Sequence, residues 1–431
     1  MQRGTGRYPA LKGRVDADVA IIGGGFSGLT SAVWLSQTGL RVALVEADTI
    51  GRGISKACAG LISMAGADFA QLNRRMGELT AETYVSTYQR TYERIREWLE
   101  PLGMWNPIEM QMVFPIGKSE MDKEWEAMRK AGVEGIARTQ MMDVPAISFR
   151  HSALLPARSY LQLLLETAEK QRVSLFEQSR VTSIETDEVH TQSGSVHAPY
   201  ILLATGYPIL NFPGWYFLWL TQRQYAWKKL TPGYSEGIFA ESGGETMVFS
   251  TGTQQRMICR LGLVGSKENR HLEKQAEERI KGLTGIRPAG KWHYSSEVHT
   301  PDGLPVIGVY SPKTPNLFAA SGYGGQGILG SAIAAQAISR KILGFPADEY
   351  EIYDGRRFWK QPWPMVCSAA RYLQSTLFHA RSPRCPHMGC RLILNPDTKL
   401  WECPCHGSSF DDIGHVIRSP AVREAILRDR K

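Results

Sequence analysis

Over the first 46 residues, the pattern of apolar and polar positions predicts two buried strands with a helix between them. The run ADVAII at 17–22 is almost continuously apolar, which is typical of a strand buried in a parallel sheet. The pattern LTSAVWLSQTG at 29–39 is typical of a helix, and the run RVALVE at 41–46 predicts a second buried strand. We therefore expect the chain to begin with a strand, a turn, a helix and a parallel strand.

Patterns farther along the chain predict both helices and strands. Residues 68–104 carry a long amphipathic helical pattern, and another helix is expected to begin at Ser119, its N-cap. Residues 179–206 predict a short antiparallel hairpin that returns to an apolar strand, and residues 222–262 alternate as antiparallel strands do. Residues 300–343 predict a strand, a glycine-dense turn and a long helix.

Composition narrows the class of protein. A chain of 431 residues exceeds one typical core, so two or three domains are expected. The net charge of +8 is scattered along the chain and not gathered in basic runs, so no nucleic-acid partner is expected. The N-terminal stretch has no apolar signal region, and the longest apolar run, 212–220, is too short to span a bilayer. These features predict a cytoplasmic protein without a membrane span, and they make no prediction of its oligomeric state.

The loop between the first strand and the first helix fits G-x-G-x-x-G through Gly23, Gly25 and Gly28. The first glycine permits a tight turn, the second lets the backbone approach a pyrophosphate, and the third lets the helix pack on the strand. The helix N-terminus offers free N–H groups to phosphates, and Glu46 can accept hydrogen bonds from ribose hydroxyls. The unit predicts a dinucleotide site; a purely structural glycine turn is the alternative.

Over about residues 16–345 the sequence resembles the D-amino-acid-oxidase-like, or glycine/sarcosine-oxidase-like, family of FAD oxidoreductases. The resemblance rests on the glycine loop, on the strand that ends at 204–206, and on the glycine-dense turn before the last long helix. It implies FAD held without a covalent bond through histidine, because residues 51–62 contain none. Cys58 in this segment is interpreted as a small buried residue, with a reactive thiol as the alternative. The FAD contacts that the resemblance implies are Gly23, Gly25, Phe26, Ser27, Gly28, Glu46, Ala47, Ser55, Ala59, Gly60, Leu61, Val181, Ala204, Thr205, Gly206, Gly322, Gly325, Gln326, Gly327 and Ile328.

The same resemblance implies a sheet-based substrate domain over the reactive face of the flavin. Tyr323 and Gln326 in the glycine-dense turn are candidate catalytic residues, together with Arg260, which could grip a substrate carboxylate through two hydrogen bonds. Arg223 and Arg256 are further candidates for that grip. An aromatic stretch predicts either a lined pocket or core packing; its members are Trp215, Tyr216, Trp219, Tyr225 and Trp227.

Two Cys/His loops lie near the C-terminus, CPHMGC at 385–390 and CPCHGSSF at 403–410. They give C-x-H, a gap of fifteen residues, and C-x-x-H, so two thiolates could hold one iron and two imidazoles the other. A structural zinc site is the alternative, because Cys₂His₂ also suits zinc. The spacing resembles Rieske [2Fe–2S] domains over about 385–421. This resemblance implies the ligands Cys385, His387, Cys403 and His406.

The Rieske resemblance carries further expectations. Cys390 and Cys405 occupy the positions that form a clip in cytochrome bc-type members, so a disulfide between them is expected. Ser408 matches a serine that hydrogen-bonds a cluster sulfur, whereas Phe410 stands where high-potential members have a tyrosine. Only about 40 residues separate the last flavin-domain helix from the first ligand, so we expect a minimal unit that leans on the flavoprotein body.

Together these patterns predict an α/β (α+β) fold with three parts. Residues 1–345 form an FAD-binding Rossmann-like domain with an inserted antiparallel-sheet substrate domain, 346–384 a linker, and 385–431 a small, mostly β Rieske domain. FAD-binding segments are expected at about 16–66, 150–206 and 300–345, with the substrate cap at about 67–149 and 207–299.

The expected function is oxidation of an amine or amino-acid C–N bond at FAD. Electrons would pass between FAD and the cluster, to or from an external one-electron partner. The alternative is a flavoprotein oxidase that reacts directly with O₂, in which the cluster serves redox sensing or structure. A Rieske oxygenase is disfavoured because no separate mononuclear-iron domain is visible in the sequence.

Overall fold

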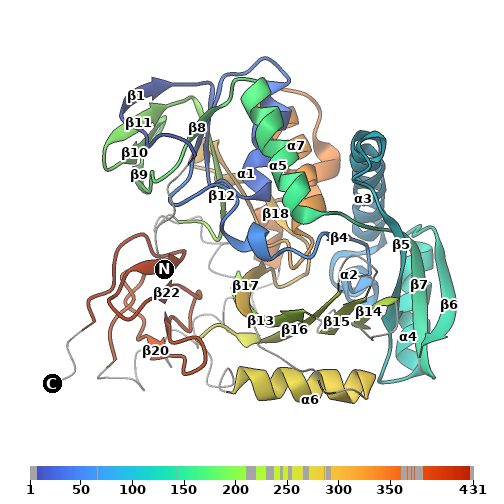
Figure 1. Cartoon of the computed structure of the whole chain (residues 1–431). Helices are drawn as coiled ribbons and strands as arrows, with labels where there is room; N and C mark the ends of the chain where they lie inside the picture. The colour runs from blue at the N-terminus through green and yellow to red at the C-terminus, as the bar shows by residue number, and fades with distance from the viewer. Residues whose placement is uncertain are drawn as a thin grey trace.

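A six-stranded sheet forms the centre of one half of the protein (Figure 1). The computed structural model describes residues 7–65, 67–141, 143–209, 220–229, 237–242, 246–250, 255–265, 271–285, 287, 293–360, 366, 370, 373 and 382–427. In sheet order the strands are β18 (Val306–Ser311), β19 (Thr314–Ser321), β12 (Tyr200–Gly206), β2 (Val19–Ile22), β3 (Val42–Val45) and β8 (Ser174–Phe176). All neighbours pair in parallel except β18 and β19, which are antiparallel.

The apolar run of β2 is continuous because both faces of this sheet are covered. Val19 and Ile21 belong to a core shared with the helices α1 (Phe26–Ser36), α5 (Ala157–Lys170) and α7 (Gly327–Ile342). Ala20 and Ile22 belong to a second core, shared with a four-stranded sheet on the opposite face. That sheet has the order β1 (Gly13–Asp16), β11 (Gly194–His197), β10 (Glu188–Thr191) and β9 (Val181–Ile184). The predicted strand–helix–strand unit and the predicted hairpin at 179–206 are both confirmed.

The second large sheet, the cap sheet, lies below the first in Figure 1. Its order is β17 (His293–His299), β13 (Thr221–Lys229), β16 (Gln255–Leu263), β15 (Thr246–Ser250), β14 (Gly237–Glu241), β5 (Pro107–Val113), β7 (Val144–Leu154) and β4 (Leu61–Ile62), with β6 (Ile136–Met141) paired to β7. The segments from 222 to 262 pair antiparallel, as predicted. The junction of β14 with β5 is parallel, which joins the two parts of the cap across a long stretch of sequence. One face of the sheet is covered by α6 (Leu272–Thr284) through Leu272, Ala276 and Ile280.

Two predicted helix boundaries in the cap are wrong. The pattern at 68–104 forms two helices, α2 (Phe69–Met76) and α3 (Glu78–Leu99), because Gly77 has a φ of 88° and breaks the helical path. The next helix, α4 (Lys118–Lys130), follows Gly117, and Ser119 lies inside its first turn without acting as a cap. Among the helices that the structure describes, none is both long and apolar enough to cross a membrane.

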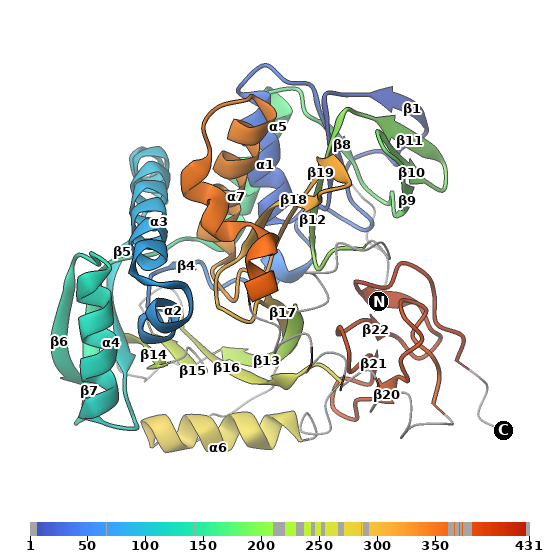
Figure 2. The same ribbon diagram turned by 180° about the vertical axis from the view of Figure 1, so that it is seen from behind.

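The C-terminal part, residues 382–427, is called the tail domain. It holds a small sheet with the order β20 (Ile393–Leu394), β21 (Trp401–Glu402), β22 (Ser409–Phe410) and β23 (Val416–Arg418), and it has its own core. Figures 1 and 2 show it beside β13, β17 and the end of α6. The tail domain is therefore a small, mostly β unit packed against the rest of the chain, called the body, as predicted.

Candidate functional site

The glycine loop between β2 and α1 is closed tightly against its surroundings. A Cβ atom on Gly28 would lie 1.9 Å from the carbonyl oxygen of Gly23. Gly23 itself has a φ of 110°, and a Cβ there would lie 2.5 Å from the carbonyl oxygen of Ala204. Gly25 is the N-cap of α1 and has no side chain to cap it, so the first N–H groups of the helix depend on partners outside it. This cradle fits a pyrophosphate group.

Glu46 lies directly after β3 and beside this cradle. Its Oε2 accepts a hydrogen bond from the Gly24 N–H at 2.8 Å, and its Oε1 accepts one from the Asp48 N–H at 2.8 Å. Burial raises the pKa of the Glu46 carboxyl, and these two hydrogen bonds oppose the rise. Each oxygen keeps a further lone pair. The residue therefore fits the role of ribose acceptor that the sequence predicts.

The expected second FAD segment lies across the mouth of the glycine loop. The Ser55 hydroxyl of the short helix η1 (Ile54–Ala57) accepts a hydrogen bond from the Phe26 N–H at 3.0 Å, so it lies at the N-terminus of α1. Gly60 has a φ of 87°, and a Cβ there would lie 2.0 Å from the carbonyl oxygen of Leu155. Ala59 and Leu61 flank Gly60, and Leu61 begins β4. The segment thus runs from the predicted phosphate site to the edge of the cap sheet.

The glycine-dense turn joins β19 to α7 and meets the N-terminus of α1. The Tyr323 hydroxyl lies 2.7 Å from the Ser27 hydroxyl, and burial raises the pKa of Tyr323. A Cβ on Gly330 would lie 2.3 Å from the Tyr323 ring, so this ring packs on α7. The Gln326 side chain donates to the Ser63 carbonyl at 2.7 Å, which connects the turn to the second FAD segment. Gly327 and Ile328 form the uncapped start of α7.

A buried charged cluster lies beneath this turn, and the sequence predicts only one of its members, Arg260, as a site residue. Arg260 of β16 forms an ion pair with Glu297 of β17 and donates to the Gly324 carbonyl at 3.2 Å. His299 Nε2 lies 3.0 Å from the same Glu297 carboxylate. Burial alone would raise the pKa of Glu297, but Arg260 and His299 outweigh it and lower the pKa to about 2. The cluster holds the turn from below, because a Cβ on Gly325 would lie 2.1 Å from Arg260 Nη2.

The remaining predicted residues are distributed as follows. Val181 is buried in the core between the six-stranded and the four-stranded sheets, whereas Ala204, Thr205 and Gly206 end β12 beside the glycine loop. Phe26 stacks on Tyr160 at 5.7 Å between ring centroids, and Ala47 is part-buried. Several candidates for the substrate pocket lie outside the described side chains; these are Arg223, Arg256, Trp215, Tyr216, Trp219 and Tyr225.

The four predicted ligands Cys385, His387, Cys403 and His406 lie close together in the tail domain. The thiols of Cys385 and Cys403 hydrogen-bond each other, which lowers the pKa of the first and raises the pKa of the second. The ring centroids of His387 and His406 lie 5.2 Å apart. His387 Nδ1 is buried, with no hydrogen-bond partner among the described residues. Burial, and then His406, lower the pKa of His387 to about 4, so its imidazole is neutral and suited to bind a metal. These residues fit a Cys₂His₂ metal centre.

The expected disulfide is absent. No disulfide joins Cys390 to Cys405, and their sulfur atoms lie with that of Cys403 within 4.8 Å of one another. Cys390 shares side-chain hydrogen bonds with Cys403 and with Cys405. Both thiols therefore lie beside the ligand candidate Cys403 in one buried cluster of cysteines.

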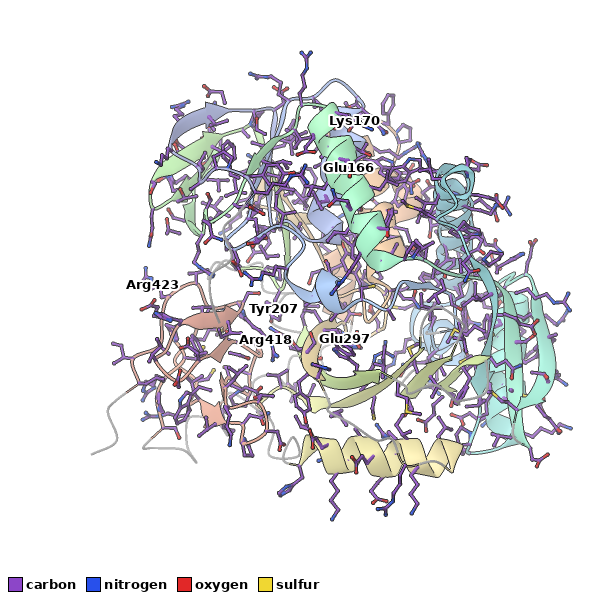
Figure 3. All side chains as sticks on the ribbon, viewed as in Figure 1. Glu166, Lys170, Tyr207, Glu297, Arg418 and Arg423 are labelled. Atoms are coloured by element: carbon purple, nitrogen blue, oxygen red, sulfur yellow. The ribbon has the colours of Figure 1, made fainter. Side chains whose placement is uncertain are left out.

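Tyr207 lies between the two sites, and the sequence does not predict it as a site residue. It follows Gly206 at the end of β12, and its ring centroid lies 6.1 Å from that of His406. Figure 3 labels Tyr207 at the boundary between the body and the tail domain. No local pattern could have identified it, because its neighbour lies about 200 residues away in the sequence.

Comparison with known proteins divides the chain in the same two parts. Residues 18–341 match the family model described as FAD dependent oxidoreductase, and residues 363–428 match that of the Rieske [2Fe-2S] domain. The Bacillus subtilis protein YhfW, whose name describes a Rieske 2Fe-2S iron-sulfur protein, is 24% identical over an alignment of 496 positions covering 96% of this chain and 94% of the relative.

Solved structures share the fold of the flavoprotein body. Glycine oxidase from Geobacillus kaustophilus aligns with a TM-score of 0.61 at 17% identity, covering 79% of this chain and 98% of that one. An L-amino acid deaminase from Proteus vulgaris aligns with a TM-score of 0.60 at 17% identity, covering 82% and 97%.

Proposed function

Because the chain belongs to the FAD-dependent oxidoreductase family and ends in a Rieske domain, we propose that it oxidises the C–N bond of a small amine or amino acid and delivers the electrons singly to an external acceptor. The substrate loses a hydride from carbon and a proton from nitrogen and becomes an imine, which water hydrolyses. Two equivalents of a one-electron acceptor each take one electron. FAD supplies the two-electron acceptor and the [2Fe–2S] cluster the one-electron exit.

The observation that carries the proposal is the contact between Tyr207 and His406. It brings the predicted cluster ligand within one residue of the strand end where FAD contacts are expected. A cluster with a purely structural role would not require this proximity. The names of the structural neighbours, a glycine oxidase and an L-amino acid deaminase, support the amine or amino-acid class of substrate.

The chain's own residues would prepare the reaction site. The uncapped N-terminus of α7, at Gly327, carries a partial positive charge that favours negative charge on the flavin edge nearest to it. The pair of Arg260 and Glu297 fixes the turn carrying Tyr323 and Gln326. Arg260 remains our candidate for contacting a substrate carboxylate, and its ion pair with Glu297 fixes the direction of its guanidinium group.

Anaerobic mixing with a panel of amines and amino acids tests the proposal. We expect one chemical class to bleach the flavin absorbance and then to produce the electron paramagnetic resonance signal of a reduced Rieske cluster. Flavin bleaching without any cluster reduction would favour the second candidate, an oxidase that uses O₂ directly. In that candidate the cluster would only brace the fold. The hydrogen bond from the Leu272 N–H, at the start of α6, to the Asp397 carboxylate of the tail domain supports such a bracing role.

A further inference from the structure

Gln222 of β13 joins the body to the tail domain directly. Its side-chain Nε2 donates to the carbonyl of His406 at 2.9 Å and to the carbonyl of Ser419 at 2.7 Å. Its Oε1 accepts from the Ser296 hydroxyl at 3.2 Å. The residue is buried, and both N–H donors and the oxygen of its amide have partners. A buried amide that is satisfied in this way fixes the position of the groups around it.

Two glycines let the backbones of the two parts approach each other closely. A Cβ on Gly407 would lie 2.7 Å from Gln222 Cβ, and a Cβ on Gly265 would lie 2.7 Å from Pro404 N. The Gly265 N–H also donates to the buried Glu402 carboxylate at 3.1 Å. Pro404 lies between Cys403 and Cys405, so Gly265 contacts the cluster loop itself. The contact leaves no space for a side chain on either glycine.

A further contact lies at the end of α6. His271 precedes this helix with a φ of 61° and caps it with no side-chain hydrogen bond. The carboxylate of Asp397, in the tail domain, accepts a hydrogen bond from the Leu272 N–H at 3.0 Å and takes that role. Gln222 and Gly265 thus contact the loop that carries His406, and Asp397 adds a third contact between the tail domain and the body.

These contacts determine what the His406 ring faces. Tyr207 is 3% exposed and His406 is also 3% exposed, so their ring contact is closed to water. Tyr207 is held in turn, because its N–H donates to the Thr205 carbonyl at 3.0 Å and the Thr205 hydroxyl donates to its carbonyl at 2.7 Å. The end of β12, Tyr207 and His406 therefore form one rigid, buried connection.

We propose that Gln222 and Gly265 are positioning residues that dock the tail domain in one fixed place, and that the Tyr207–His406 contact is the route by which electrons leave the flavin site. The inference rests on the proposed function and specifies the path that the electrons take. One electron moves in each step, the flavin side loses it and the cluster gains it, and no bond is formed or broken. A fixed dock means that the cluster exchanges electrons with the flavin without swinging away from it.

Anaerobic flash photoreduction of the flavin in the holoenzyme, with EDTA as sacrificial donor, measures this route without any substrate. The first variant is Gly265→Ala, whose methyl group would meet the backbone of Pro404. Its matched control is Gly344→Ala, because Gly344 has a φ of 73° against 74° for Gly265 and nothing within 4 Å of a Cβ. The second variant is Tyr207→Leu, with Tyr200→Leu at the other end of β12 as its control.

We expect both variants to slow electron transfer from flavin to cluster by about tenfold or more, which is equivalent to about 1.4 kcal/mol of activation free energy. The FAD content and the electron paramagnetic resonance spectrum of the cluster should remain those of the wild type. Amide hydrogen exchange in 403–407 should increase in Gly265→Ala and not in Gly344→Ala. The two controls should transfer electrons at the wild-type rate.

Wild-type transfer rates in Gly265→Ala and Tyr207→Leu would overturn the dock and the route while leaving the relay in place. If the wild-type cluster receives no electron from the photoreduced flavin, the proposed relay itself is overturned, and the route with it. If Tyr207→Leu does not fold, Gly265→Ala alone decides, because its methyl group lies outside the predicted FAD contacts and cluster ligands.

Discussion

Ser408 shows how a single hydroxyl group could tune the metal centre. Its side chain hydrogen-bonds the thiol of Cys385 and accepts a hydrogen bond from the Ala421 N–H at 3.1 Å. It is fully buried, so its contacts act in a medium of low dielectric constant. A donor to a ligand sulfur stabilises the more negative, reduced cluster and raises its reduction potential.

The variant Ser408→Ala should therefore lower the reduction potential of the cluster. Loss of one hydrogen bond to a charged sulfur, about 1.4 kcal/mol, corresponds to about 60 mV for a one-electron couple. Protein-film voltammetry measures the shift. Ser409→Ala is the matched control, because the buried Ser409 hydroxyl donates to the Gly407 carbonyl and should leave the potential unchanged. A potential that falls equally in both variants would contradict the assignment of Ser408.

His387→Cys should lower the reduction potential more strongly. An anionic thiolate would replace a neutral imidazole, and all-cysteine clusters have potentials lower than Rieske clusters by on the order of several hundred mV. The same voltammetry applies, with His415→Cys as control, because His415 lies in the tail domain and pairs with Asp411 away from the cysteines. An unchanged potential in His387→Cys would mean that His387 does not bind the metal.

At the scale of elements, the buried carboxyl of Glu124 ties α4 to the start of α2. Its oxygens accept hydrogen bonds from the Phe69 N–H at 2.7 Å and the Ala70 N–H at 2.8 Å. Burial raises its pKa to about 7, and these two hydrogen bonds oppose the rise. Its pKa in the unfolded chain is near 4.5. The folded protein thus binds this proton more tightly than the unfolded chain does.

Glu124 should make the protein less stable as pH rises from about 4.5 to about 7, because the folded state then gives up a proton that it held more tightly. Thermal unfolding midpoints across that range measure the slope. Glu124→Gln should remove the part of the slope that Glu124 contributes, and Glu126→Gln, on the exposed side of the same helix, should keep the wild-type profile. An unaltered slope in Glu124→Gln would show that this carboxyl does not titrate there.

The packing of α1 on the glycine loop gives a second prediction at this scale. In Gly28→Ala the new methyl group would meet the Gly23 carbonyl at 1.9 Å, so the helix must shift. We expect a loss of about 1–3 kcal/mol in stability, typical of overpacking, and a lower FAD content per chain. Gly282→Ala in α6 is the control, since nothing lies within 4 Å of a Cβ there and a gain of about 0.5–1 kcal/mol is expected. Full FAD content in Gly28→Ala would contradict the phosphate cradle.

The elements that the sequence predicts well are those with strong local signals. The run at 19–22 is apolar throughout because β2 is buried on both faces, so each of its residues must be apolar. The break at Gly77 was missed because α2 and α3 turn their apolar faces to the same core, which keeps the pattern continuous across the glycine. The parallel pairing of β14 with β5 depends on contacts distant in sequence, which no local period records.

In the candidate site, too, the residues with local sequence signals are predicted well and those brought together by distant pairing are not. The spacing of Cys385, His387 and their partners is local, so the sequence predicts the metal centre well. Glu297 and His299 become neighbours of Arg260 only because β17 and β16 both flank β13. Gln222 reaches the tail domain across a similar separation.

At the scale of the whole molecule, two redox sites share one buried boundary. The body places the expected flavin contacts at the ends of β2, β12 and β19, and the tail domain presents His406 to the residue that follows β12. The hydrogen bonds across this boundary join Gln222, Gly265 and Leu272 of the body to the tail domain. This arrangement is the basis for our proposal that electrons pass between the two sites.

The most direct test of that claim is the reoxidation of substrate-reduced flavin by a one-electron acceptor in Cys403→Ser, which should lack the cluster. Circular dichroism and FAD content first establish that the variant is folded and loaded. We predict that substrate reduces its flavin at nearly the wild-type rate, and that reoxidation by the acceptor is slower by about tenfold or more, the factor by which a barrier about 1.4 kcal/mol higher slows a reaction. Reoxidation at the wild-type rate in the folded, FAD-loaded variant would contradict the account, because electrons would then leave without the cluster.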